Sequence, residues 1–144
     1  MNIHEHYKIL EFEEHGDERG NLVIVEGNKD IPFEIKRVFY MYGTDAAMIR
    51  GSHANRKSEF VLVNVAGKAD IKVDDGFSTA VIELNKPRMG LYIPRMLWKD
   101  MYNFSRDSVL LVLASEHYDS EEYIRDYNEY LKEVRETKIF LKKM

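Results

Sequence analysis

Short apolar runs separated by turn-forming residues recur along most of the chain. The runs are rich in β-branched and aliphatic residues, and Lys68–Val73 alternates apolar and polar positions as a half-buried strand does. Asp74-Asp75-Gly76 is typical of a tight turn between two such strands. The pattern predicts strands at 7–12, 21–26, 35–42, 60–63, 68–73, 77–84, 89–94 and 108–115, with 21–26 buried.

The last part of the chain has a different period. Asp119-Ser120-Glu121-Glu122 is typical of a helix start, because acidic side chains favour the positive end of the helix dipole. Apolar residues then recur at helical spacing, which predicts one helix over about 119–136. Many short strands followed by one helix indicate a mainly β fold, a barrel or sandwich with a C-terminal α-helix, in a single domain spanning 1–144.

Two polar stretches interrupt the apolar runs. Arg50–Glu59 reads as a loop at the mouth of a hairpin, rich in groups that bind or titrate. Small β-barrels commonly have a pocket at such a mouth, so we expect the site there. Arg95–Phe104 mixes aromatic and charged residues and is expected to line a rim of the barrel.

Composition narrows the classes of function. With 21 basic and 25 acidic residues, the 144-residue chain has a formal net charge of -4, which favours neither nucleic acid nor an anionic membrane. There is no cysteine for a disulfide or a thiolate metal site. No apolar run approaches the ~20 residues that span a bilayer, and the charged N-terminus is unlike a signal peptide. We therefore expect a cytoplasmic protein that binds neither nucleic acid nor membrane.

His53 is the only histidine inside the first polar stretch. An imidazole near its free pKa can accept a proton from carbon or oxygen at neutral pH, or it can simply hydrogen-bond a loop. The spacing Gly51-x-His53-x-Asn55-x-x-x-Glu59 resembles the first cupin motif, in which metal-binding members have a second histidine at the position of Asn55. Their third histidine lies on a later strand, where Lys99 is the equivalent here. A protonated lysine repels metal cations, so no metal is expected.

Basic and aromatic residues near the predicted strand ends suggest an anionic ligand with a ring. Arginine forks match phosphate oxygens, so converging basic side chains could bind a diphosphate, although any one of them can be a solvated surface charge. Tyr40, Tyr92 and Trp98 could stack on a nucleobase or sugar, although aromatic residues in strands more often lie in the core. No Walker loop, GxGxxG or nucleophile elbow is present, which argues against nucleotide-dependent redox chemistry and serine hydrolysis. The basic candidates are Arg19, Arg37, Arg50, Arg56 and Lys57.

Several segments together resemble one family. Ile31–Tyr40 is similar to the IPFxIKRVYY segment of the sugar-nucleotide 3,4-ketoisomerases, the WxcM-like cupins of the FdtA and QdtA kind. Arg50–Lys57 resembles their RGxHAHK motif, and further matches follow in the same order over roughly residues 9–130. These are Asp74-Asp75-Gly76, Gly90-Leu91-Tyr92, Trp98, Val112-Leu113-Ala114-Ser115, Tyr118-Asp119 and Tyr123-Ile124-Arg125.

The resemblance implies a cupin jelly roll, usually a homodimer, that acts on dTDP-4-keto-6-deoxyglucose. Members serve deoxysugar biosynthesis for surface glycans such as lipopolysaccharide. They move the carbonyl from C4 to C3 by two proton transfers through an enediol or enediolate, with no metal and no redox cofactor. A base removes the proton at C3, and the face on which C4 receives a proton sets the configuration of the product.

The resemblance also implies roles for individual residues. His53 matches the first motif histidine and is the expected proton-transfer residue. Arg19 matches an arginine in the early turn that faces the sugar in some members. Arg37, Arg50 and Lys57 match basic positions near the nucleotide or the pocket wall.

Three positions depart from the family pattern. Asn55 stands in place of the second motif histidine and can orient a hydroxyl but cannot titrate, and Phe39 replaces a tyrosine. Lys99 follows Trp98 where some members have histidine; a lysine there can stabilise an enediolate, or act as a base if burial lowers its pKa. These departures leave open a ketoisomerase with His53 as sole imidazole, a related epimerase, and a non-catalytic sugar-nucleotide-binding cupin.

Overall fold

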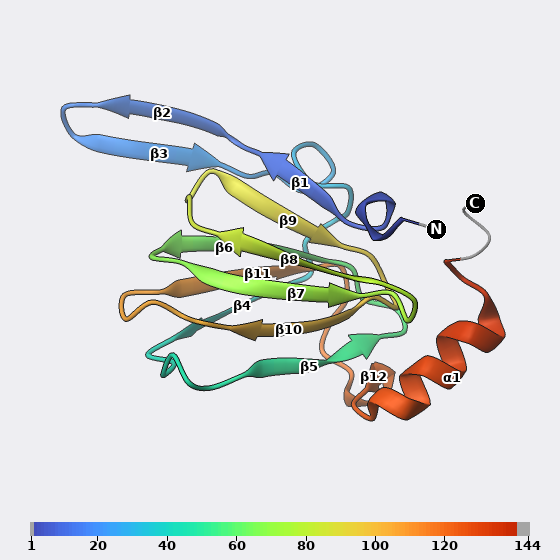
Figure 1. Ribbon diagram of the computed structural model, residues 1–144. Helices are drawn as coiled ribbons and strands as arrows, with labels where there is room; N and C mark the ends of the chain where they lie inside the picture. The colour runs from blue at the N-terminus through green and yellow to red at the C-terminus, as the bar shows by residue number, and fades with distance from the viewer. Residues whose placement is uncertain (1, 141–144) are drawn as a thin grey trace.

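Two five-stranded antiparallel sheets face each other in the computed structural model, which describes residues 2–140 (Figure 1). The first sheet has the order β1 (Lys8–Glu11), β9 (Met89–Ile93), β6 (Phe60–Ala66), β11 (Val109–Ala114) and β4 (Arg37–Tyr42). The second has the order β12 (Tyr123–Ile124), β5 (Arg50–Asn55), β10 (Trp98–Tyr102), β7 (Ala69–Asp74) and β8 (Thr79–Leu84). A mainly β fold with one C-terminal helix, α1 (Tyr127–Thr137), is therefore confirmed.

The remaining elements are short. Strands β2 (Glu13–Asp17) and β3 (Gly20–Ile24) form a separate hairpin that projects from one end of the molecule (Figure 1). Two 3-10 turns, η1 (Ile3–Glu5) and η2 (Ser120–Glu122), precede β1 and β12. No helix within residues 2–140 is long and apolar enough to cross a bilayer.

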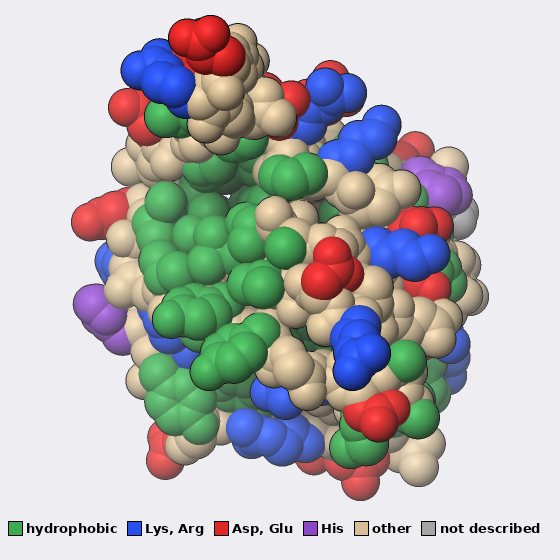
Figure 2. All heavy atoms as spheres, turned by 90° about the vertical axis from the view of Figure 1, so that its left-hand side faces the viewer, with side chains coloured by type: hydrophobic (Ala, Val, Ile, Leu, Met, Phe, Trp, Pro, Cys, Tyr) green, Lys and Arg blue, Asp and Glu red, His purple; other side chains and the backbone are tan. Residues whose placement is uncertain are grey.

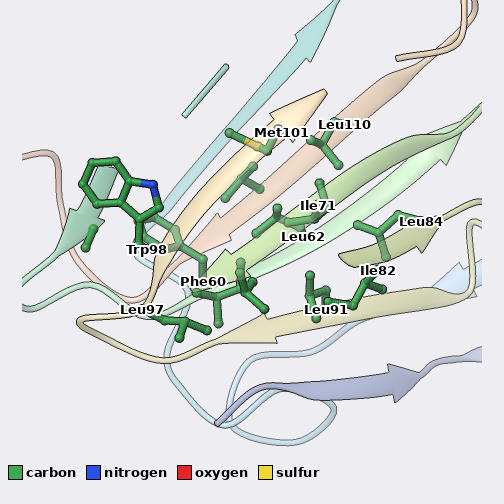
Figure 3. Close-up of a cluster of buried hydrophobic side chains, with 14 of the residues drawn as sticks. Phe60, Leu62, Ile71, Ile82, Leu84, Leu91, Leu97, Trp98, Met101 and Leu110 are labelled. Atoms are coloured by element: carbon green, nitrogen blue, oxygen red, sulfur yellow. The ribbon is translucent and has the colours of Figure 1, made fainter. Parts of the chain in front are cut away.

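The main core lies between the two sheets and explains the alternation in the sequence. Phe60 and Leu62 of β6 point inward, where Figure 3 shows them among Ile71, Leu91 and Leu110 from neighbouring strands. Their neighbours on β6 point to the opposite face and join a second apolar cluster. Because β6 is buried on both faces, it appears in the sequence as a continuous apolar run. The second cluster on the outer face includes Phe12, Ile31, Phe33, Val61 and Val63.

The expected loop at Arg50–Glu59 is instead largely strand. Residues 50–55 form β5, which pairs with β10, but the register shifts so that Lys99 faces His53 while Asp100 faces Gly51. Ser52 is the extra residue of this bulge, with Gly51 and Ser52 both left-handed at φ 82° and 58°. The Ser52 hydroxyl donates to Asp100 Oδ1 at 2.6 Å and holds the bulge to β10. Polar side chains and a glycine concealed this strand in the sequence.

The segment expected to form the rim is also a strand. β10 lies in the middle of the second sheet, between β5 and β7. Its side chains alternate, so Lys99 and Met101 face the space between the sheets while Trp98 packs on the other side against α1. Lys99 occupies an inward position that is normally apolar, which is why the sequence pattern did not show a strand here.

The C-terminal helix begins at Tyr127 rather than near 119. Asp119 instead caps the turn η2, and Tyr123 and Ile124 form a strand whose backbone pairs with Asn55 and Ala54 of β5. The true helix cap is Asp126, whose side chain accepts from the backbone N–H of Glu129 at 3.1 Å. Sheet pairing thus outcompetes the helical spacing of residues 119–124.

The strand expected to be buried at 21–26 is exposed. β3 pairs only with β2, and four of its five residues are exposed in this single chain. Leu22 is 57% exposed and Ile24 is 37% exposed. The strand contains apolar residues, as predicted, but within residues 2–140 most of its surface is not covered.

Candidate active site

A cavity of about 120 Å³ opens between the two sheets and combines apolar walls with a few polar groups. Phe39 of β4, Phe60 of β6 and Met101 of β10 supply much of the apolar surface. The polar side chains that line it are Arg50, His53, Lys99 and Tyr123. A concave apolar site with a few converging polar groups is the usual form of a small-molecule pocket.

His53 and Lys99 face each other across β5 and β10 in the wall of this cavity. Burial, the neighbouring Lys99 charge and the Arg125 charge together lower the pKa of His53 from 6.5 to about 3, against a backbone hydrogen bond with Gly51. The imidazole is therefore neutral at neutral pH. A neutral imidazole has a free lone pair and can accept a proton from a bound ligand.

Lys99 is buried, with 4% of its surface exposed. Its Nζ lies 3.2 Å from Asn55 Oδ1 and 4.6 Å from the centroid of the Phe60 ring. Burial lowers the pKa of Lys99 from 10.5 to about 7, although the charges of Glu122 and Asp100 oppose this. Lys99 can therefore exchange a proton near neutral pH, and Asn55 orients it through the amide oxygen.

Glu122 directly precedes β12, the strand from which Tyr123 lines the cavity. It is 3% exposed and accepts from the backbone N–H of Lys57 at 3.0 Å and of Ser58 at 2.8 Å, as well as from the Ser58 hydroxyl. Burial alone would raise the pKa of Glu122, but the hydrogen bonds from Ser58 and Lys57 outweigh it and hold the pKa below its usual range. A charged Glu122 thus fixes residues 57–58 and favours the protonated form of Lys99.

Arg37 and Tyr123 form a second polar pair beside His53. Arg37 Nη1 donates to Tyr123 Oη at 3.4 Å, and the Tyr123 ring lies 4.8 Å from the His53 ring. The Arg37 guanidinium packs over the rings of Phe39 and Phe60. Its Nε and Nη2 are buried without a hydrogen-bond partner among residues 2–140, so two of its donors remain for an anionic ligand.

The structure brings some of the expected site residues together and leaves others apart. His53, Asn55, Lys99, Arg37 and Arg50 meet in or beside the cavity. The side chain of Lys57 is exposed, so only its backbone contributes, through Glu122. The basic candidate Arg56 is paired with Glu133 of α1 instead of facing the cavity.

Three further candidates lie outside the cavity for clear reasons. Trp98 points away from it because β10 alternates, and it packs against Tyr127 and Tyr130 of α1 at ring distances of 5.2 and 5.4 Å. Tyr40 points outward from β4 and is 60% exposed. Arg19 lies at the tip of the β2–β3 hairpin, where it pairs with Asp17, far along the chain's projecting arm (Figure 1).

Glu122 and Tyr123 are site residues that the sequence analysis did not assign. Both fall in the segment read as a helix start, in which Glu122 would have been a surface acid. The pairing of β12 with β5 places Tyr123 at the cavity instead, while the buried Glu122 beside it binds residues 57–58. The family-like Tyr123-Ile124-Arg125 match was a sequence signal for Tyr123, although it carried no role, and it did not include Glu122.

A metal centre has no ligand cluster in the described chain. Within residues 2–140, no three His, Cys, Asp or Glu side chains are grouped closely enough to hold a metal ion. The cavity itself presents one imidazole beside a lysine and an arginine. Cationic neighbours of this kind repel a metal and suit an anionic ligand.

Comparison with known proteins gives consistent matches over nearly the whole chain. Residues 5–135 match the family model described as FdtA, WxcM-like, C-terminal. The TDP-4-oxo-6-deoxy-alpha-D-glucose-3,4-oxoisomerase of Aneurinibacillus thermoaerophilus is 43% identical over 127 residues, which cover 88% of this chain and 91% of that protein.

Solved structures agree in both sequence and fold. A 3,4-ketoisomerase from Helicobacter canadensis superposes with a TM-score of 0.87 and 46% identity, covering 90% of this chain and 97% of the other. A variant of the 3,4-ketoisomerase QdtA from Thermoanaerobacterium thermosaccharolyticum, in complex with TDP-4-keto-6-deoxyglucose, gives a TM-score of 0.89 at 39% identity. That match covers 91% of this chain and 95% of QdtA.

Proposed function

The chain belongs to the WxcM-like family of FdtA-type cupins, and we propose that it is a sugar-nucleotide 3,4-ketoisomerase acting on dTDP-4-keto-6-deoxyglucose or a close relative. The observation that carries the proposal is the pairing of His53 with Lys99 inside an apolar cavity of a protein of this family. The named relatives are enzymes, which favours catalysis over mere binding. Substrate and product are isomers, so the reaction needs only proton transfer and no oxidant.

His53 is the base in this proposal. A neutral imidazole takes the C3 proton, and negative charge develops on the oxygen at C4. Burial is the main reason that a protonated His53 is disfavoured, and the developing charge offsets the further effect of the two neighbouring cations, Lys99 and Arg125. The enediolate charge therefore raises the pKa of His53 as it forms, against the effect of burial, and makes removal of the C3 proton easier.

Lys99 stabilises the same negative charge. Its ammonium is held by Asn55 in a buried setting, where an electrostatic interaction is stronger than in water. Asn55 cannot titrate, so its role is to orient Lys99 and a sugar hydroxyl. This arrangement gives one imidazole and one asparagine where the family motif has two histidines, with Lys99 beside them.

Arg37 and Arg50 are the proposed contacts for the diphosphate and the sugar oxygens. Arg50 lines the cavity, and its side chain is exposed at the mouth. Arg37 has two buried donors without a partner in the described chain, as a fork waiting for oxygen atoms would. Lys57 and Arg19 remain candidates for contacts outside the cavity.

A homodimer completes this proposal. Apolar side chains gather on the outer face of the first sheet, and Figure 2 shows such a patch on one side of the molecule. Val38 is 53% exposed there and Val65 is 42% exposed, beside a groove of about 500 Å³ that Val23 and Leu111 also line. An exposed apolar surface of this extent is typical of an interface. A second copy on this face could also receive the hairpin, which would carry Arg19 towards that copy.

The proposal includes a cytoplasmic location for the reaction, where a cell makes nucleotide-linked sugars of this class. The product would serve deoxysugar assembly for surface glycans, including lipopolysaccharide.

NMR of the purified protein with dTDP-4-keto-6-deoxyglucose in deuterated buffer tests the proposed function. We expect conversion to a 3-keto sugar that carries deuterium at C4, and the C4 configuration names the product. Tight binding without exchange at C3 and without conversion would contradict the proposal and indicate a binding protein.

A further inference from the structure

Tyr123 contributes a hydroxyl group to the cavity wall, and this group has no role in the proton transfers to and from carbon. It lines the cavity from β12, and its ring packs against the ring of His53 at 4.8 Å. Arg37 Nη1 donates to the phenolic oxygen at 3.4 Å, so that oxygen acts as an acceptor. Within residues 2–140, the Tyr123 hydroxyl donates to no acceptor, so its proton can point to a ligand.

Moving a carbonyl from C4 to C3 requires more than moving a hydrogen between carbons. The oxygen on C3 begins as a hydroxyl and ends as a carbonyl, while the oxygen on C4 does the reverse. A proton must therefore leave O3 and another must reach O4. His53 serves the carbon atoms, and an arginine such as Arg50 stays protonated and cannot relay a proton. Tyr123 and Lys99 are the remaining titratable groups of the cavity wall.

We propose that the Tyr123 hydroxyl carries this proton between the two oxygens, with Arg37 holding it in place. The inference rests on the proposed ketoisomerase function and assigns a step within it. Tyr123 stands beside the base and not behind it, so both groups can contact the same two-carbon unit of the sugar. Lys99, on the neighbouring strand β10, then remains the charge that stabilises the enediolate.

The steps balance without any co-reactant. His53 takes the C3 proton, the C3–C4 double bond forms, and the electrons of the C4 carbonyl move to O4, which takes the proton of Tyr123. The phenolate, paired with Arg37, then takes the O3 proton as C3 becomes a carbonyl. The electrons of the C3–C4 double bond take a proton from the His53 imidazolium at C4. Both residues end in their starting states.

Tyr123→Phe tests the assignment because it removes the hydroxyl and keeps the ring that packs on His53. With dTDP-4-keto-6-deoxyglucose in deuterated buffer, we expect conversion to fall by about 10²-fold or more. Solvent exchange of the C3 hydrogen should fall much less, because His53 can still remove and return that hydrogen. The ratio of exchange to conversion should therefore rise by about tenfold or more.

A structural role would give a different result. If Tyr123 only positioned His53, exchange and conversion would fall by the same factor, which overturns the inference, as would a variant with unchanged conversion. Tyr118→Phe is the matched control, since Tyr118 also contacts Tyr123 and Arg37 but is 62% exposed and does not line the cavity. We expect it to keep both rates.

Two further measurements keep the outcomes separate. Binding of dTDP and the thermal unfolding midpoint establish that Tyr123→Phe is folded; should it unfold, Arg37→Met, which leaves the hydroxyl without its donor, must raise the same ratio or the inference fails. The wild-type protein in the same buffer reports on the proposed function itself. A wild type that neither exchanges nor converts overturns both proposals, whereas an active wild type with an unchanged ratio in Tyr123→Phe overturns only this one.

Discussion

At the scale of residues, the cavity depends on how two titratable side chains share a confined space. His53 and Lys99 are adjacent across two strands, and both burial and the Lys99 charge disfavour a protonated His53. As a result, the cavity contains a neutral base, His53, and a lysine that can carry a positive charge near neutral pH. Asn55 and Glu122 keep the cation in place, and neither can replace the base.

His53→Asn should remove turnover and leave binding nearly intact. Asparagine keeps a polar side chain of similar reach but cannot accept the C3 proton, so we expect kcat to fall by ~10²–10⁴. The affinity for the substrate should change little, because the proposed anion contacts are Arg37 and Arg50. NMR conversion rates and calorimetric binding measure the two quantities.

His117→Asn is the control for this prediction, because His117 is exposed and lies outside the cavity. It should keep the wild-type rate. A His53→Asn protein that also kept the wild-type rate would show that another group is the base.

Lys99 makes stability depend on pH in a defined window. Its pKa is about 7 in the folded protein and 10.5 as the ordinary value, so the unfolded state binds more protons between these limits. The cost of the buried charge is fully present below pH 7 and disappears as the pH rises towards 10.5, and the free energy of unfolding should increase over that range.

Lys99→Met isolates this effect. We expect the stability of the variant relative to the wild type to be highest at about pH 6, because only the wild type then carries the buried charge whose cost disappears at higher pH. The difference should shrink as the pH rises, which urea unfolding at several pH values measures. Two parallel curves would mean that Lys99 titrates normally, and enzyme activity of the variant should be lost in either case.

At the scale of elements, the sequence predicted those strands whose inward residues are apolar. β7 alternates buried and half-buried residues, while β6 and β11 are largely apolar and mostly buried. All three strands lie close to the positions that the pattern predicted. β5 and β10 were not predicted as strands because their inward positions carry His53 and Lys99. The same polar residues that make the site therefore conceal the strands that hold it.

The family resemblance supplied what periodicity could not. It pointed to His53, Asn55, Lys99 and Arg37, which the structure does bring together. The resemblance included Trp98 but did not show which residues its ring contacts. Only the alternation of side chains along β10 shows that the ring points towards α1. Local spacing also misread residues 119–124, where pairing with β5 depends on residues far away in the chain.

Trp98 tests the relation between β10 and α1. Its ring lies between the strand and Tyr127 and Tyr130, so Trp98→Leu should lower the free energy of unfolding by roughly 2–4 kcal/mol. Because the ring points away from the cavity, KM for the sugar nucleotide should stay within about threefold of the wild type. Val81→Ala, at an exposed position of β8, is the control that should change neither value. A large rise in KM with unchanged stability would mean that Trp98 contacts the substrate.

At the scale of the whole molecule, one chain leaves two features unsatisfied. The β2–β3 hairpin projects with Leu22 and Ile24 exposed, and the outer face of the first sheet carries an apolar groove (Figures 1 and 2). Both would be buried if a second copy packed on that face. The homodimer is thus a proposal about stability as well as about the site.

Val38→Lys should separate the copies. The change places a charge in the groove, where burial without a partner is costly, so we expect the protein to become a monomer at micromolar concentration. Analytical ultracentrifugation gives the mass directly. Val81→Lys is the matched control, because Val81 is 55% exposed but lies on β8 of the opposite sheet, and this variant should keep the mass of the wild type. If Val38→Lys and Val81→Lys have the same mass as the wild type, the groove is not the interface. If the wild type is itself a monomer, the homodimer proposal is wrong, and Arg19 stays at the hairpin tip beside Asp17 as in the single chain.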